Sequence, residues 1–153
     1  MYIELSLVSY EDKTILYHLI QLYRYDSSEF DDHVLNQHGL YLYKFLDHQW
    51  TDEYRRPFIV KIDGEIAGFV LVSLDLPKEF TKLSTSDKTN VISDFFIIRK
   101  FRRKGIGKKV AFSIFNQFRG GWEIKQTISN KTANVFWKNV INEYTGTSTY
   151  KRR

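Results

Sequence analysis

The sequence contains no cysteine, and this absence excludes several kinds of chemistry. Without a thiol the chain cannot form a disulfide, hold zinc through thiolates or use a cysteine nucleophile. It also lacks an apolar run of about 18 residues, the length that a membrane span needs. Residues 1–5 carry no basic flank that leads into an apolar stretch, so no signal peptide is expected in them. We therefore expect a soluble cytoplasmic protein that does not associate with membranes.

The length and composition are those of one globular domain. A chain of 153 residues is long enough to bury a single sizeable core. Its 42% hydrophobic and 27% charged residues are typical of a folded protein and exclude a disordered one. The 12 Phe, 10 Tyr and 3 Trp make the chain rich in aromatic residues, which suit a packed core and a ligand cleft.

The positive charge of the chain is concentrated in one short stretch. The net charge is +5, and seven of the 23 basic residues lie within residues 99–109, where there is no acidic residue. Outside this stretch 16 basic residues face 18 acidic ones. Proteins that bind nucleic acid usually spread basic residues over a face, so this alternative is disfavoured. One compact basic stretch better fits one compact anion, such as a pyrophosphate.

Apolar periodicity predicts a mixed sheet covered by helices. Helices are expected over residues 10–25, 106–118 and 133–143. Strands are expected over 58–62, 66–74, 91–98 and 122–128, the first two joined by a hairpin turn at Asp63-Gly64. The long apolar run of 91–98 indicates a central strand covered on both faces. Residues 40–50 fit either a short helix or an ordered loop, and 76–90 is expected to be a loop.

The most informative segment is a basic turn between a strand and a helix. The turn contains Gly105 and Gly107, and the helix is expected to begin there. A helix N-terminus presents unpaired N–H groups and a partial positive charge, and glycine lets an anion approach the backbone closely. Further positive charge comes from Arg102, Arg103, Lys104 and Lys108. These features predict a pyrophosphate site.

Two familiar glycine-loop motifs do not fit this turn. A nucleotide P-loop needs Ser or Thr after its lysine, but Lys108 is followed by Lys109. The dinucleotide fingerprint needs a third small residue where Val110 stands. The pattern Arg102-x-x-Gly105-x-Gly107 after a strand fits a third motif, Arg/Gln-x-x-Gly-x-Gly/Ala.

With this motif the sequence resembles the GCN5-related N-acetyltransferase (GNAT) family over most of its length. The first helix, the Asp63-Gly64 hairpin and the later pattern Asn130-x-x-Ala133-x-x-Phe136-Trp137 support the resemblance. It implies one N-acetyltransferase domain over residues 1–153 with an α+β, three-layer fold, in which helices flank a mixed, mainly antiparallel twisted sheet. The family usually ends with two further strands, and the chain after Tyr144 has room for one. An open C-terminal edge would leave a homodimer as one way to complete the sheet.

The resemblance implies acetyl-CoA as the co-substrate. The backbone near the end of strand 91–98 would bind the pantetheine arm, and N–H groups of residues 103–108 would hold the pyrophosphate. Asn130 would reach the pantetheine, and the aromatic pair that follows it would pack along it. The expected cofactor-binding residues are Phe96, Ile97, Ile98, Arg102, Arg103, Lys104, Gly105, Ile106, Gly107, Lys108, Asn130, Phe136 and Trp137.

The resemblance also implies direct acetyl transfer to a primary amine of a small molecule or peptide. Such an amine has a pKa of about 10.4, and making it neutral at pH 7 costs roughly 4–5 kcal/mol, so a base helps. Asp94 is the expected base because it precedes the strand section that would hold the thioester. The alternative is a carboxylate that is paired or faces solvent. A backbone N–H near Phe96 or Ile97 is expected to stabilise the oxyanion.

One departure from the family pattern puts the proton donor in doubt. The family often has a tyrosine where Trp137 stands, and an indole cannot act as that acid. Tyr144 is the expected substitute, with packing and a water donor as alternatives. A catalytically altered acyl-CoA-binding protein of the same fold is therefore the second interpretation.

The acceptor side of the site is poorly specified by the sequence. The acidic residues Asp26 and Glu29 lie where the family places its substrate-side helix and loop, and they are expected to attract a cationic amine. The alternative is a solvated acidic loop. The four histidines, His18, His33, His38 and His48, do not have the spacing of metal ligands, and no metal site is expected.

Overall fold

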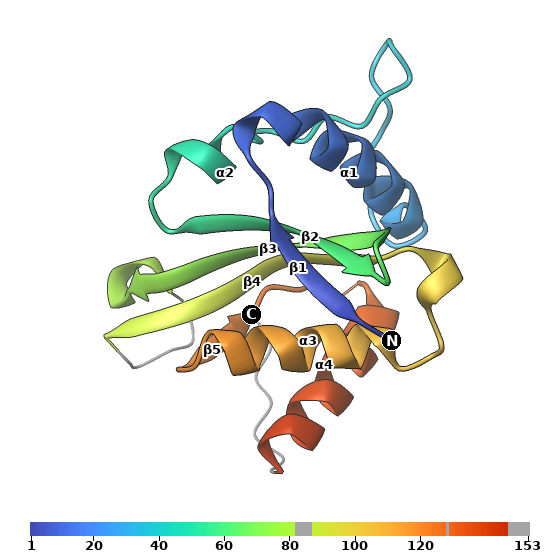
Figure 1. Cartoon of the computed structure of the whole chain (residues 1–153). Coiled ribbons are helices and arrows are strands. Elements are labelled where there is room, and N and C mark those ends of the chain that lie inside the picture. The colour runs from blue at the N-terminus through green and yellow to red at the C-terminus, as the bar shows by residue number, and fades with distance from the viewer. Residues whose placement is uncertain (82–86, 128, 147–153) are drawn as a thin grey trace.

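The computed structural model describes residues 1–81, 87–127 and 129–146. Within them the chain forms a five-stranded sheet whose strands lie side by side in chain order (Figure 1). The strands are β1 (Ile3–Leu7), β2 (Arg55–Ile62), β3 (Glu65–Pro77), β4 (Lys88–Ile97) and β5 (Trp122–Ile124). The first four strands pair antiparallel, and β5 pairs parallel with β4. The mixed, mainly antiparallel sheet expected from the sequence is confirmed.

Helices cover both faces of the sheet and create two separate cores (Figure 1). The helices α1 (Lys13–Ser27) and α2 (His48–Thr51) lie on one side, and α3 (Ile106–Gln117) and α4 (Lys131–Thr145) lie on the other. Because side chains alternate along a strand, Phe69 and Leu71 of β3 pack toward α1, whereas Val70 and Val72 pack toward α3. Because a core covers each face of the sheet, the middle sections of these strands are apolar at almost every position.

The predicted helices are confirmed with shifts of a few residues at their ends, and α2 resolves the ambiguity in residues 40–50. The strand β1 was missed, and residues 88–90 belong to β4 and not to a loop. The last predicted strand is too long, because β5 ends at Ile124. The further C-terminal strand that the family pattern allows would fall within residues 147–153, outside the described residues. Every helix in the described ranges is too short or too polar to cross a membrane.

A β-bulge interrupts the pairing of β3 with β4. Leu71 pairs with Asp94 while Val72 pairs with Ile92, which leaves Ser93 as the extra residue. The Ser93 hydroxyl donates a hydrogen bond to the Leu71 carbonyl oxygen at 3.1 Å. An extra residue reverses the alternation of side chains and bends the strand. The bulge therefore puts Ile92 on the α3 face and Asp94 on the α1 face of the same strand.

The bulge is also the point at which β4 and β5 separate. Their parallel pairing ends with Ile92 opposite Ile124, followed by one hydrogen bond from the Lys125 N–H to the Ile92 carbonyl oxygen at 2.9 Å. Beyond this point β4 continues to Ile97, and among the described strands only β3 pairs with it there. The second edge of β4 is thus released from β5 over the residues that follow the bulge.

The close approach of the paired strands β3 and β4 leads to a first testable prediction. A Cβ atom built on Gly68 would lie 1.9 Å from the carbonyl oxygen of Phe96, so an alanine there must push two central strands apart. We expect Gly68→Ala to lower the free energy of unfolding by about 3 kcal/mol, measured by urea denaturation. The control is Gly121→Ala, whose Cβ would meet no heavy atom of the described residues within 4 Å. It should change stability by less than about 0.5 kcal/mol, and equal effects of both variants would contradict this account of the packing.

Candidate active site

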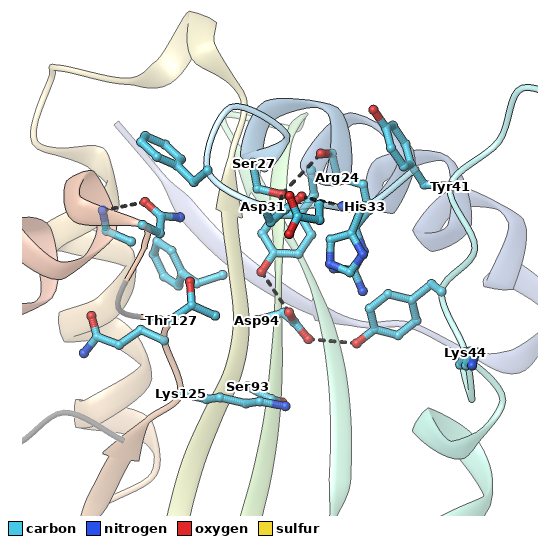
Figure 2. Close-up of a pocket in the computed structure, with 18 of the residues that line it drawn as sticks. Arg24, Ser27, Asp31, His33, Tyr41, Lys44, Ser93, Asp94, Lys125 and Thr127 are labelled. Carbon is cyan, nitrogen blue, oxygen red and sulfur yellow. Dashed lines mark hydrogen bonds between the residues drawn. The ribbon is translucent and has the colours of Figure 1, made fainter. Parts of the chain in front are cut away.

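A cavity of about 900 Å³ opens where β4 and β5 separate. Its walls come from the C-terminal half of α1, the segment 30–45, the bulged part of β4, the residues after β5 and the first turns of α4 (Figure 2). Asp94 lies near the centre of the residues drawn in Figure 2, with hydrogen bonds on both sides. The bulge therefore delivers the predicted base to a cavity large enough for a small ligand.

Two tyrosines hold the carboxylate of Asp94. The Tyr23 hydroxyl donates to Oδ1 and the Tyr43 hydroxyl donates to Oδ2, each at 2.8 Å. Burial raises the pKa of Asp94, and it outweighs the opposing effects of the two phenol hydrogen bonds and of the positive charges of Lys125 and Arg24. A carboxylate with a raised pKa is a better proton acceptor than an ordinary aspartate.

The tyrosines themselves stay protonated. Burial is the main cause that raises the pKa of both phenols, and the negative charge of Asp94 raises it further. Each phenol therefore acts as a hydrogen-bond donor to Asp94 and not as a second base. Because one donor holds each carboxylate oxygen, Asp94 has a fixed orientation within the cavity.

The helix α1 positions both tyrosines. Tyr23 follows Leu16, Leu19 and Ile20 on the face that packs on the sheet, and its ring meets Phe69 edge-on at 5.4 Å between centroids. Gln21, on the same helix, fixes the segment that carries Tyr43. Its side chain donates to the Tyr41 carbonyl oxygen at 2.8 Å and accepts from the Tyr41 N–H at 2.7 Å. One helix thus aligns two donors that are far apart in the sequence.

The released edge of β4 presents backbone groups to the space that β5 has left. The Ile98 N–H donates to the Ala67 carbonyl oxygen at 2.7 Å, and hydrogen-bonded pairs alternate along an antiparallel ladder. The backbone of Phe96 therefore faces β3, and that of Phe95 and Ile97 faces away from it. The backbone contacts expected of Phe96 and Ile98 stay predictions: Phe96 faces β3, and Ile98 already donates its N–H to Ala67 and accepts from the Phe101 N–H.

The glycine turn has the conformation that the sequence predicts. Gly105 is the N-cap of α3 with a φ of 71°, a left-handed conformation that favours glycine. The first N–H groups of a helix have no acceptor within the helix, so those of α3 point out of its N-terminus. A Cβ on Gly107 would lie 3.1 Å from the Phe136 ring, so this glycine lets α4 approach α3 at the same place. Arg103, Lys104 and Gly105 are exposed, and Ile106 is buried in the core.

Arg102 and Asp26 form an ion pair that joins the turn to α1. The Arg102 Nη2 lies 2.8 Å from the Asp26 Oδ2, and Arg99 Nη2 lies 3.1 Å from the other oxygen. The Arg102 Nε donates to the Ile97 carbonyl oxygen at 2.8 Å. Asp26 was expected to bind the acceptor amine, but it is outside the residues that line the cavity and is held by two arginines.

Three further predicted residues lie together on α4 at the cavity wall or behind it. Asn130 lines the cavity, and its Oδ1 caps α4 by accepting the Ala133 N–H at 3.0 Å. The cap uses only the oxygen of the amide, so its NH₂ group can still donate to a ligand. Trp137 is buried and meets Phe95 edge-on at 5.0 Å between centroids, and Phe136 packs on the same ring at 5.8 Å.

Two predicted residues are not brought to the cavity. The Tyr144 ring packs against Phe112 of α3, and its hydroxyl donates to the Asn116 side chain at 2.7 Å and accepts from Arg119 at 3.0 Å. Tyr144 lies about two turns of α4 beyond Trp137 and is not among the residues that line the cavity, so it does not fit the predicted proton donor. Glu29 is exposed and does not line the cavity, whereas Asp31 and Asp32 do.

Most of the basic stretch is engaged in ion pairs. Besides the pairs of Arg99 and Arg102, Lys100 lies 2.6 Å from Glu65 and Lys108 lies 3.1 Å from Glu143. Four of the seven basic residues thus have a carboxylate partner. A surface that is already neutralised in this way is poorly suited to many phosphates at once, which weighs further against nucleic-acid binding.

The fold is that of acyl-CoA N-acyltransferases, as solved structures show. An acetyltransferase from Thermus thermophilus is 16% identical, with a TM-score of 0.70 over 91% of this chain and 85% of that chain. A ribosomal-protein-alanine N-acetyltransferase from Brucella melitensis biovar Abortus 2308 is 14% identical, with a TM-score of 0.62 over 99% and 94%. A predicted acetyltransferase from Clostridium acetobutylicum, solved with acetyl-CoA, is 10% identical, with a TM-score of 0.58 over 89% and 88%. At these identities the similarity shows the fold alone.

The sequence itself shows the family. The family model of the acetyltransferase (GNAT) family matches residues 16–138, which is most of the chain. The chain therefore belongs to the GNAT family, as the glycine motif predicts. A search of curated protein sequences returns no match.

The ion pair between α1 and the glycine turn leads to a second prediction, on pH and stability. Burial acts to raise the pKa of Asp26, but the hydrogen bonds and charges of Arg102 and Arg99 outweigh it and hold that pKa below its usual value. The folded state therefore binds the proton less well than the unfolded chain, whose aspartates have a pKa of about 3.9. We expect Asp26→Asn to cost about 1 kcal/mol at pH 7. The cost should persist down to about pH 4 and vanish as the pH falls through the lower folded value.

Urea denaturation of both proteins between pH 3 and 7 measures this difference. The control is Glu29→Gln, which removes one negative charge from the same segment at an exposed position. It should show no comparable pH-dependent loss. A cost of Asp26→Asn that grows as the pH falls would contradict the assigned sign.

Proposed function

We propose that this protein is an acetyl-CoA-dependent N-acetyltransferase that moves an acetyl group directly from the thioester to a primary amine of a small molecule or peptide. The observation that carries the proposal is the position of Asp94. It is a carboxylate with a raised pKa, held by two tyrosines, in the cavity that opens where β4 leaves β5. A base beside an open strand edge is what direct transfer to an amine requires.

The residues of this chain fit the co-substrate. Acetyl-CoA supplies an activated acetyl group as a thioester. The outward N–H groups at the start of α3 and the left-handed Gly105 suit a pyrophosphate. The outward backbone of Phe95 and Ile97 suits an extended pantetheine arm, which would pair with β4 as an added strand. The Asn130 NH₂ group and the buried wall of Phe136 and Trp137 suit its polar and apolar parts.

Asp94 would act as the general base. The acceptor amine must lose a proton to become nucleophilic, and Asp94 would take that proton directly or through water. Burial raises the pKa of Asp94. The difference between this pKa and that of the amine becomes smaller, so the proton transfer costs less free energy. Tyr23 and Tyr43 would act as positioning residues, because they reach the carboxylate and not the acetyl group.

The outward N–H of Phe95 would stabilise the negative charge that develops on the acetyl oxygen. It lies on β4 immediately after Asp94, so base and donor share one rigid strand. A preorganised donor of this kind contributes several kcal/mol to catalysis. The departing thiolate also needs a proton. Trp137 cannot supply it and Tyr144 is bonded to Asn116, so we assign this proton to water.

Co-substrate binding gives the third prediction. Acetyl-CoA at about 100 times its Kd should stabilise the protein by about 2.7 kcal/mol, which a thermal-shift assay detects. Gly107→Leu should abolish that shift. A side chain at this position, in the first turn of α3, displaces the Phe136 ring of α4. The double variant Arg103→Glu with Lys104→Glu should reduce the shift through charge alone at two exposed positions.

Gly121→Leu is the control for these variants, since it adds the same side chain at an open glycine. It should keep the full shift. If Gly107→Leu does not fold without ligand, the charge variant decides the matter. A full shift in the charge variant would show that the pyrophosphate binds elsewhere. If the unmodified protein shows no shift, the proposal that it binds acetyl-CoA is overturned.

The tyrosine contacts give the fourth prediction, on the pH dependence of kcat/KM. Asp94→Asn should lower kcat/KM by about 10²–10⁴-fold. Tyr43→Phe removes a hydrogen bond that lowers the pKa of Asp94, so this pKa rises further. Because only the ionised carboxylate is a base, the acidic limb of the pH profile should then move to higher pH.

Tyr25→Phe is the matched control, because it makes the same change at an exposed tyrosine of α1, the helix that carries Tyr23. Its pH profile should coincide with that of the unmodified protein. An acidic limb that stays in place in Tyr43→Phe would show that Asp94 is not the titrating base. Full turnover of Asp94→Asn at every pH would remove Asp94 from the mechanism.

A further inference from the structure

The cavity beside Asp94 is lined by more basic than acidic side chains. The basic residues are Arg24 on α1, Lys44 in the segment before α2, Arg55 on β2 and Lys125 after β5. The acidic ones are Asp31, Asp32 and Asp94 itself. Four separate parts of the chain thus each place a basic side chain at one cavity. The sequence instead predicts acidic residues there, which would attract a cationic amine.

Most of these cations have no anionic partner among the residues that the structure describes. The Arg55 Nε is paired with the Asp52 carboxylate at 3.1 Å. Within residues 1–81, 87–127 and 129–146, Arg24, Lys44 and Lys125 form no ion pair. The basic lining is therefore not neutralised from within, and positive charge is available to a ligand.

Arg24 is the most informative of these residues. Its guanidinium lies over the Tyr43 ring at 5.2 Å from the centroid, and its Nη1 contacts the His33 Nε2 at 2.5 Å. Its Nε is buried and has no hydrogen-bond partner among the described residues. A buried donor without an acceptor is costly, and a charged acceptor would relieve this cost best. The stacking on Tyr43 also ties Arg24 to the phenol that holds Asp94.

These cations are separate from the turn that is expected to hold the pyrophosphate of the coenzyme. Residues 99–109, which carry the pyrophosphate turn, do not line this cavity. Figure 2 shows Lys125 below Asp94 and Lys44 on the far side of the cavity from Thr127. The free cations therefore surround the place where the acceptor amine would meet Asp94.

Resting on the proposed function, we propose that the acceptor is a zwitterion: a primary amine that carries an anionic group, a carboxylate or a phosphate, within a few bonds of its nitrogen. The amine lies at Asp94 and the anion lies between Arg24 and Lys125. A polyamine or aminoglycoside brings only positive charge and is repelled by this lining. The cations also disfavour the ammonium form of the acceptor, which helps Asp94 to remove its proton.

The experiment compares paired acceptors that differ in the anionic group alone. Thiol release from acetyl-CoA is measured for an α-amino acid and its amide, and for O-phosphoethanolamine and ethanolamine, with spermidine as a polycation. In at least one pair we expect kcat/KM to be at least about tenfold higher for the anionic member, which corresponds to about 1.4 kcal/mol. The pair that shows this preference tells a carboxylate from a phosphate.

Variants then assign the preference to residues. Lys125→Gln and Arg24→Gln should each lower the ratio of kcat/KM within the preferred pair toward one. Removing a cation also raises the pKa of Asp94, but this affects both members of a pair and cancels in the ratio. Lys138→Gln removes a charge from an exposed position on α4 and should leave the ratio unchanged. Lys125 is also exposed, so its variant tests the proposal even if Arg24→Gln does not fold.

The outcomes separate this inference from the function on which it rests. Equal kcat/KM within both pairs, or a preference that survives both variants, overturns the zwitterionic acceptor and leaves the N-acetyltransferase standing. A higher kcat/KM for spermidine than for every anionic amine does the same. Absence of thiol release with every amine, despite binding of acetyl-CoA, overturns the transferase function and the inference together.

Discussion

The extra residue at Ser93 is the constraint on which the site depends. Without it, Ile92 and Asp94 would share one face of β4, and Asp94 would point into the core beneath α3. The bulge turns Asp94 toward α1, bends β4 away from β5 and releases the outer edge of the strand. One irregularity thus determines the position of Asp94, the cavity around it and the open backbone edge beside it.

The helix α1 positions the polar groups that surround Asp94 and the glycine turn. Its apolar face anchors on β2 and β3, and its C-terminal half then sends four polar side chains in different directions. Gln21 holds the segment that carries Tyr43, Tyr23 holds Asp94, Arg24 enters the cavity and Asp26 holds the glycine turn. A small shift of this helix would therefore change both the surroundings of Asp94 and the position of the glycine turn.

The sequence predicts those parts of the site that depend on local geometry. The glycine turn, the start of α3 and the Asn130 cap follow from residues close together in the chain, so their patterns are visible. The contacts of Tyr23 and Tyr43 with Asp94 span 71 and 51 residues, and no local pattern marks them. The bulge is hidden within a continuous apolar run, where a register break changes no period. The extent of β5 was overestimated for the same reason, because its partner strand leaves at that break.

The contacts of Arg102 determine how α1 and the end of β4 respond to salt. Through one guanidinium, the end of α1 is tied to the last carbonyl of β4, on which an added strand would lie. Both partners are only partly covered, with 27% of the Asp26 side chain and 35% of the Arg102 side chain exposed. Dissolved ions weaken such a contact. Rising ionic strength is therefore expected to loosen α1 from the end of β4, because both are held by the same Arg102 side chain.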